Sequence, residues 1–114
     1  MPSATAITVY LFGASVVYQG ASILFAPRRA LAAKGLPESA LPSLNAFSVA
    51  ASGIGLFYIL AAYQENKIFF AFSLLRLPAA VIFWAQGPGW HAMATWEALS
   101  TLLTAGALAW DARS

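Results

Sequence analysis

Four apolar stretches of similar length, separated by short polar segments, dominate the pattern of hydrophobic and polar positions along the chain. They cover residues 6–26, 44–64, 67–86 and 91–110. Each is close to the ~20 residues that an α-helix needs to cross ~30 Å of hydrocarbon. The pattern predicts an all-α integral membrane protein, in which residues 1–114 form one domain of four transmembrane helices in an antiparallel, up-and-down bundle.

The polar segments between these stretches differ in length. Segment 26–43 holds three prolines, two adjacent arginines and a lysine, and it has room for a short surface helix. Segments 64–67 and 87–90 are tight turns, typical of antiparallel helix neighbours. Because consecutive spans run in opposite directions, segment 26–43 and the 87–90 turn lie on the same side of the membrane. That side has three basic residues against two on the other, so the positive-inside rule favours its facing the cytosol.

The composition agrees with a membrane protein. Hydrophobic residues make up 61% of the chain and charged residues 9%, with a mean hydropathy of +0.72, whereas soluble domains carry about 25% charged residues. The N-terminus lacks the basic region of a secretory signal, and its apolar run is too long for one, so we interpret it as the first span. We expect a multi-pass protein of the endoplasmic reticulum in a eukaryote or of the inner membrane in a bacterium.

Several classes of function are excluded by the residues that the chain lacks. It has no cysteine, which excludes disulfides, thiolate nucleophiles, iron–sulfur clusters and thiolate zinc sites. The net charge is +2 and the basic residues are scattered, so we expect no nucleic-acid partner. There is one histidine and no phosphate-binding loop. We therefore expect neither a metal nor a cofactor.

Small residues recur in the first two predicted spans. Gly13-Ala14-Ser15 is repeated seven residues later as Gly20-Ala21-Ser22, and the second span contains "SVAASGIG" at 48–55. Small side chains allow helix backbones to approach closely in lipid. These repeats predict tight packing of the first two helices.

Two charged residues, Arg76 and Glu97, lie inside the predicted spans. A charge at this depth costs at least ~2.5 to 3.5 kcal/mol and is a candidate functional group by default. At 1.5 Å per residue, Arg76 lies about 15 Å and Glu97 about 9 Å below the membrane face that holds the 87–90 turn. An extended arginine can cover the ~6 Å difference between adjacent helices, so the two side chains can form a pair. Such a pair could also be only a structural lock that sets helix register.

Other polar and aromatic residues are expected near the same level, where they would form a pocket open toward that face. Glu97, Arg76 and His91 are the candidate catalytic residues. The candidate substrate-binding residues are Tyr18, Gln19, Asn45, Ser48, Ser52, Phe72, Phe83, Trp84, Trp96 and Thr101. Alternatives stay open for some of them: His91 is also a normal solvated residue at a helix start, and Trp84 is also a candidate for the interfacial aromatic belt.

Three segments of the chain resemble the small four-helix membrane proteins of the DoxX-like superfamily, in particular its DUF4267 family. They are "GASILFAPRRALAAKGLP" at the end of the first span, "SVAASGIGLFYILAA" in the second, and "LLRLPAAVIFWAQGPGWHAMATWEA" around the 87–90 turn. The resemblance implies a four-helix membrane fold and little about chemistry. In fungi such small membrane proteins sometimes accompany biosynthetic enzymes, which motivates an enzymatic hypothesis.

Two functional hypotheses follow. The first is a membrane-embedded enzyme that binds a lipophilic small molecule and performs cofactor-free acid/base chemistry, such as cyclisation, isomerisation or epoxide opening, with Glu97 moving the proton and Arg76 orienting it or stabilising negative charge. The second is a non-catalytic membrane scaffold that tethers biosynthetic enzymes. The expected partners are the lipid bilayer and a lipophilic substrate, with further copies of the chain or pathway enzymes as additional candidates.

Overall fold

The computed structural model describes residues 2–113, which form four long helical segments joined by short connections. The long segments are α1 (Ala4–Phe25), α3 (Leu41–Tyr63), the continuous run of α4 (Lys67–Phe72), η2 (Ser73–Leu75) and α5 (Arg76–Ala85), and α6 (His91–Arg113). The connections hold α2 (Pro27–Lys34), η1 (Glu38–Ala40) and η3 (Pro88–Trp90). The predicted all-α character is confirmed for the described residues, and a helical segment covers each of the four predicted stretches. Helix α2 is the short helix expected in segment 26–43.

Three helical segments are long and apolar enough to cross a membrane: Ala4–Phe25, Glu38–Tyr63 and Lys67–Ala85. The fourth, α6, has 23 residues and therefore the length, but its polar residues make it less apolar than the other three. Many large apolar side chains point outward, among them Phe25, which is 91% exposed, and Ile68, which is 74% exposed. Such an outer surface suits hydrocarbon better than water.

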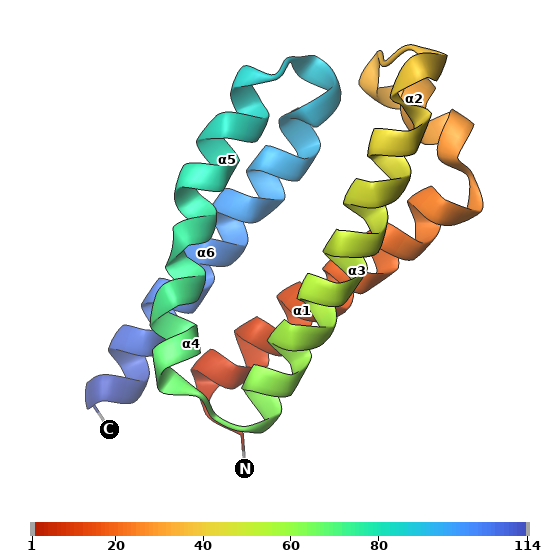
Figure 1. Cartoon of the computed structure of the whole chain (residues 1–114). Coiled ribbons are helices and arrows are strands. Elements are labelled where there is room, and N and C mark those ends of the chain that lie inside the picture. Colours follow the sequence, from red (N-terminus) through yellow and green to blue (C-terminus); the bar gives the residue numbers. More distant parts are fainter. Residues whose placement is uncertain (1, 114) are drawn as a thin grey trace.

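The long helices form two pairs (Figure 1). In one pair α1 packs along α3, and in the other α5 packs along α6. Helix α1 also contacts α6, and the pairs meet at the end that holds both termini and again where α2 contacts η3. Helix α1 is therefore the central element that joins the two pairs.

Close contact between α1 and α3 depends on glycine. A Cβ atom built on Gly13 would lie 2.8 Å from the carbonyl oxygen of Gly55, and one built on Gly55 would lie 2.6 Å from the carbonyl oxygen of Gly13. Two helical turns further along α1, a Cβ on Gly20 would lie 2.8 Å from the carbonyl oxygen of Ser48. The predicted tight packing of small residues between the first two helices is confirmed.

Gly55→Ala is expected to destabilise the fold by about 1 to 3 kcal/mol, the usual cost of overpacking. The added methyl group meets backbone atoms of Gly13 and Val17, which move only if α1 and α3 separate. The measurement is the free energy of unfolding in a detergent–lipid mixture. Gly53→Ala is the matched control, since a Cβ there has nothing within 4 Å. Equal stability of the two variants would contradict the close backbone contact.

A tightened turn interrupts the third long helix just before Arg76. Residues Ser73–Leu75 are 3₁₀-helical, and Pro78, one turn later, lacks the N–H that the carbonyl of Leu74 would accept in a regular α-helix. The backbone N–H of Arg76 donates to the carbonyl of Ser73. Its side-chain Nε donates to the same oxygen at 2.9 Å. The Arg76 side chain therefore points back toward the N-terminal side of its own helix, the usual direction for long helical side chains.

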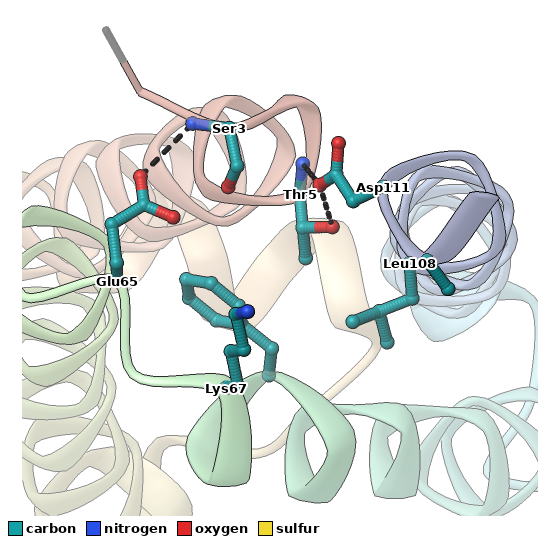
Figure 2. A pocket seen from close by; sticks show the side chains of 8 residues that line it. Ser3, Thr5, Glu65, Lys67, Leu108 and Asp111 are labelled. Atoms are coloured by element: carbon teal, nitrogen blue, oxygen red, sulfur yellow. Dashed lines mark hydrogen bonds between the residues drawn. The ribbon is translucent and has the colours of Figure 1, made fainter. Parts of the chain in front are cut away.

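The N-terminus of α1 is fixed by carboxylates from two other elements (Figure 2). Glu65, in the α3–α4 turn, accepts a 2.9 Å hydrogen bond from the Ser3 amide. Asp111, near the end of α6, accepts from the Thr5 amide at 2.9 Å and from the Thr5 hydroxyl at 2.6 Å. Negative charge at a helix N-terminus interacts favourably with the helix dipole. These contacts tie α1 to both neighbouring segments.

Stability is expected to fall when the solution becomes acidic enough to protonate these carboxylates. Hydrogen bonds from Ser3 lower the pKa of Glu65, and hydrogen bonds from the Thr5 hydroxyl and then its amide lower the pKa of Asp111. Because the folded pKa values lie below the ordinary values of 4.5 and 3.8, the stabilisation is complete above those values and is lost as pH falls through the folded ones. Thermal unfolding midpoints measured between about pH 3 and pH 7 test this.

Asp111→Asn should flatten part of that acid dependence, since the amide carries no titrating proton. Glu38→Gln is the control, because the exposed Glu38 carboxylate pairs with Arg28 and does not contact α1's first turn. An acid dependence unchanged by Asp111→Asn would show that this carboxylate does not contribute.

Candidate functional site

A cavity of about 360 Å³ lies between the two helix pairs. Helices α3 and α5 form its walls, while α1 and α6, which contact each other, form its base. It is lined by Phe12, Val16, Gln19, Phe47, Ala50, Ala51, Ile54, Tyr58, Phe72, Leu75, Arg76, Ala79, Phe83, Met93 and Glu97. The lining is mainly aromatic and aliphatic, with four polar side chains. This combination is typical of sites for small lipophilic ligands.

A larger hollow, of about 430 Å³, lies at the end of the molecule that holds both termini (Figure 2). Its lining includes Glu65, Asp111 and Lys67. The two carboxylates are already bonded to the first residues of α1. We therefore assign this hollow a structural role and place the candidate site in the cavity between the helix pairs.

Arg76 is the buried cation of the cavity, with 5% of its surface exposed. Its guanidinium donates to the Ser73 carbonyl at 2.9 Å, to the hydroxyl and carbonyl of Ser100 at 3.4 Å each, and to the Thr104 hydroxyl at 2.8 Å. All of these acceptors are neutral. The protein thus holds a full positive charge in a fixed position without placing a carboxylate against it.

Two aromatic rings pack against the same guanidinium. Its central carbon lies 4.2 Å from the centre of the Phe12 ring and 5.5 Å from that of the Tyr58 ring. The two rings lie 5.1 Å apart in a tilted arrangement. Cation–π contacts of this kind are worth ~0.5 to 2 kcal/mol and become stronger away from water. They help to stabilise the buried side chain of Arg76.

A chain of hydroxyl groups extends from Arg76 to α1. The Thr104 hydroxyl, which accepts from Arg76, lies 2.9 Å from the Thr8 hydroxyl. The Thr8 hydroxyl donates to the Thr5 carbonyl at 2.7 Å, so Thr104 is the donor between the two threonines. This chain of hydrogen bonds connects Arg76 on α5 to Thr104 on α6 and to Thr8 on α1.

Glu97 is the carboxyl group of the cavity. Its Oε2 atom is buried and has no hydrogen-bond partner among the residues that the structure describes. Burying a polar atom without a partner costs about 1 to 3 kcal/mol, and more for a charged group. Native structures leave few such atoms, and those that persist require an explanation.

Within residues 2–113, Arg76 and Glu97 do not form the ion pair that the sequence allows; Arg28–Glu38 is the pair that is observed there. The prediction from depth alone was wrong because it let the arginine extend in either direction. Arg76 points toward the start of its own helix, and in the antiparallel pair this leads it to Ser100 and Thr104, away from Glu97. Both charged groups nevertheless line the same cavity.

Five of the predicted site residues meet in this cavity: Arg76, Glu97, Gln19, Phe72 and Phe83. The others lie outside its lining. Tyr18 and Trp96 line a neighbouring groove of about 400 Å³, which shares Gln19 and Met93 with the cavity. There Trp96 donates from Nε1 to the Ser15 hydroxyl at 2.8 Å.

The remaining predicted residues have structural contacts. Ser48 and Ser52 sit in the α1–α3 contact, where their hydroxyls donate to the carbonyls of Leu44 and Ser48 at 2.8 and 2.9 Å. Thr101 is buried and donates to the Glu97 carbonyl at 2.6 Å. His91 and Trp84 stack on each other with ring centres 3.6 Å apart, beside the α5–α6 turn. Asn45 is half-buried on α3.

Sequence reasoning missed the aromatic residues nearest the buried charge, Phe12 and Tyr58. The helical repeat offers a signal for the first, because Phe12 and Val16 precede Gln19 by seven and three residues and so share its face. Tyr58 belongs to a similar stripe on α3 with Phe47, Ala51 and Ile54. The repeat identifies such stripes, but which stripe faces the cavity depends on how the helices are rotated.

Trp90 closes the end of the cavity beside α2 and η3. Its ring contacts the cavity residues Phe83 and Phe47, with ring centres 5.8 and 6.1 Å away. The Lys34 ammonium lies 4.7 Å from the centre of the same ring, and burial lowers the pKa of that lysine. This cluster holds the two helix pairs together at the end of the molecule that carries the connection between α1 and α3.

Comparison of the chain with protein-family models, with curated proteins and with solved structures finds no match in any of the three. The resemblance to DoxX-like proteins therefore stays a prediction.

Proposed function

We propose that the protein spans a membrane four times and is an enzyme that binds a lipophilic small molecule in the cavity between its helix pairs. Glu97 donates or accepts a proton in cofactor-free chemistry, such as cyclisation, isomerisation or epoxide opening. The observation that carries this proposal is the buried, unpartnered Oε2 of Glu97 in an apolar cavity that also holds Arg76.

The distribution of side chains on α6 supports a fourth span. Its polar residues Ser100, Thr101 and Thr104 are buried against the neighbouring helices, whereas Leu102 and Leu103 are each 60% exposed. The helix therefore presents an apolar outer face despite its polar composition. A transmembrane helix that keeps its polar groups inside the bundle has this pattern.

The two charged groups suit acid/base chemistry on a bound molecule. A general acid or base must be able to reach the substrate. Glu97 lines the cavity, and no described donor bonds to its Oε2. Arg76 is held by neutral acceptors, so its charge is available to stabilise negative charge that develops on a substrate. Fixed charges in a water-excluding site act strongly and need no rearrangement during the reaction.

The route into the cavity also favours a lipophilic ligand. Ile54 on α3 and Phe72 and Leu75 on the facing segment line the cavity and are 51 to 66% exposed. These apolar side chains border an opening between α3 and the α4–η2 segment, on the outer surface of the molecule. In a bilayer this opening faces the acyl chains, so a molecule dissolved in lipid can enter without crossing water.

Ala79→Trp is expected to remove a small molecule that copurifies with the wild-type protein. Ala79 lines the cavity, and an indole there occupies a large share of its 360 Å³. Native mass spectrometry of protein released from lipid nanodiscs detects the bound molecule. Val81→Trp is the matched control, because Val81 lies on the same helix outside the cavity lining and is 67% exposed. Equal ligand occupancy in both variants would refute the cavity as the binding site, and a wild-type protein without ligand would favour the scaffold hypothesis.

A further inference from the structure

We propose that the molecule taken by this cavity is uncharged and that its polar head carries a hydrogen-bond acceptor beside a hydrogen-bond donor, as in a primary amide, a protonated carboxylic acid or a hydroxy ketone. This inference rests on the proposed function and defines the class of substrate. It follows from the charges of the cavity, the unused hydrogen-bonding groups, and the shape of the apolar lining.

The charge of the cavity is balanced without a ligand. Arg76 and Glu97 are the charged residues of its lining, one of each sign. They do not touch, yet both lie in an enclosure whose other walls are mainly apolar. A charged ligand would leave an uncompensated charge there, which is costly away from water. An uncharged ligand leaves the balance unchanged.

The unused hydrogen-bonding groups are of opposite kinds. A guanidinium has five N–H donors, and the four hydrogen bonds of Arg76 leave one on Nη1. Glu97 lines the same cavity, its buried Oε2 has no hydrogen-bond partner among the described residues, and a carboxylate only accepts hydrogen bonds. A ligand with an acceptor alone would satisfy Arg76 and leave Glu97 without a partner. A head with both groups satisfies the two residues together.

The lining of the cavity determines the size and shape of the apolar part of the ligand. Phe12, Phe47, Tyr58, Phe72 and Phe83 place aromatic rings on several sides of the cavity, and such rings pack well against flat, unsaturated bodies. At ~30 Å³ for each water-sized group in a liquid, the 360 Å³ of the cavity holds about twelve such groups. A two-ring aromatic body with a small polar head is of this size.

The test compares three probes with the same two-ring body: naphthamide, methyl naphthoate and the naphthoate anion. Binding is measured by titration calorimetry with the full chain in lipid nanodiscs, and empty nanodiscs give the background from partitioning into lipid. We expect naphthamide to bind about 10 to 100 times more tightly than the methyl ester, the range for a hydrogen bond to a charged group. The naphthoate anion should bind less tightly than the amide.

Glu97→Met should reduce the preference for amide over ester to within a few-fold, because the acceptor for the amide N–H is gone. Glu38→Gln, outside the cavity, should keep the full preference. If Glu97→Met does not fold, Glu97→Gln serves in its place and should reduce the preference. Equal binding of amide and ester by the wild type, or tightest binding of the anion, would overturn the inferred head group while leaving the lipophilic site intact. If no probe binds, or if the binding of every probe persists in Ala79→Trp, the result would count against the proposed function itself.

Discussion

Glu97→Gln is expected to accumulate in membranes at near wild-type levels and yet to lower product formation by about 10² to 10⁴-fold, the usual share of general acid–base catalysis. Glutamine keeps the shape of the side chain but has no proton to exchange. Glu97 is the carboxyl group of the cavity lining, so no neighbouring acid there can replace it. The measurement is product yield in a host that expresses the protein together with the enzymes of the proposed pathway, normalised to the amount of the protein in membranes.

Glu38→Gln is the matched control for this experiment. Glu38 is exposed and forms a 2.8 Å ion pair with Arg28 on the surface, and such pairs contribute little to stability. Its loss should leave product yield unchanged. Equal yields from Glu97→Gln and wild type would remove Glu97 from the mechanism. In that case the scaffold hypothesis, in which pathway output does not depend on a titrating group in the bundle, would be favoured.

The positions of the helices could be predicted from the sequence because they follow from local features of the chain. An apolar run of about 20 residues bounded by polar turns has the length of a membrane-spanning helix, and each of the four runs coincides with a helical segment. The close approach of α1 and α3 could also be predicted. Glycine and serine repeats mark the place where two backbones approach, and Gly13 and Gly55 do meet there.

The arrangement around Arg76 could not be predicted in the same way. The rise per residue places Arg76 level with the middle of α6, but the direction of its side chain and the choice of neutral acceptors depend on the 3₁₀ turn and on helix rotation. The walls of the cavity also depend on how the helices pack in three dimensions. The segment α4–η2–α5 follows α3 directly in the chain, yet α3 packs along α1 and α5 packs along α6. The space between α3 and α5 exists because α1 and α6 pack together behind it.

Arg76→Met is expected to destabilise the fold by about 2 to 5 kcal/mol, within the range for breaking a buried charged hydrogen-bond network. Methionine fills much of the same volume against Phe12 and Tyr58 but donates no hydrogen bond, so the link from α5 to Ser100 and Thr104 on α6 is lost. The change also leaves Glu97 as the one remaining charged group of the cavity. The measurement is the free energy of unfolding in lipid–detergent mixtures.

Two double-mutant cycles then distinguish the observed network from the ion pair that the sequence allowed. Residues that share a hydrogen bond show coupling energies of about 0.5 to 3 kcal/mol, so Arg76→Met combined with Thr104→Val should lie in that range, given the 2.8 Å bond between them. Arg76→Met combined with Glu97→Gln should give a smaller coupling, since these side chains share no hydrogen bond in the described structure. A larger coupling for Glu97 than for Thr104 would mean that, in the membrane, Arg76 turns toward the carboxylate, and that the unpartnered oxygen on which the proposed chemistry depends is not free.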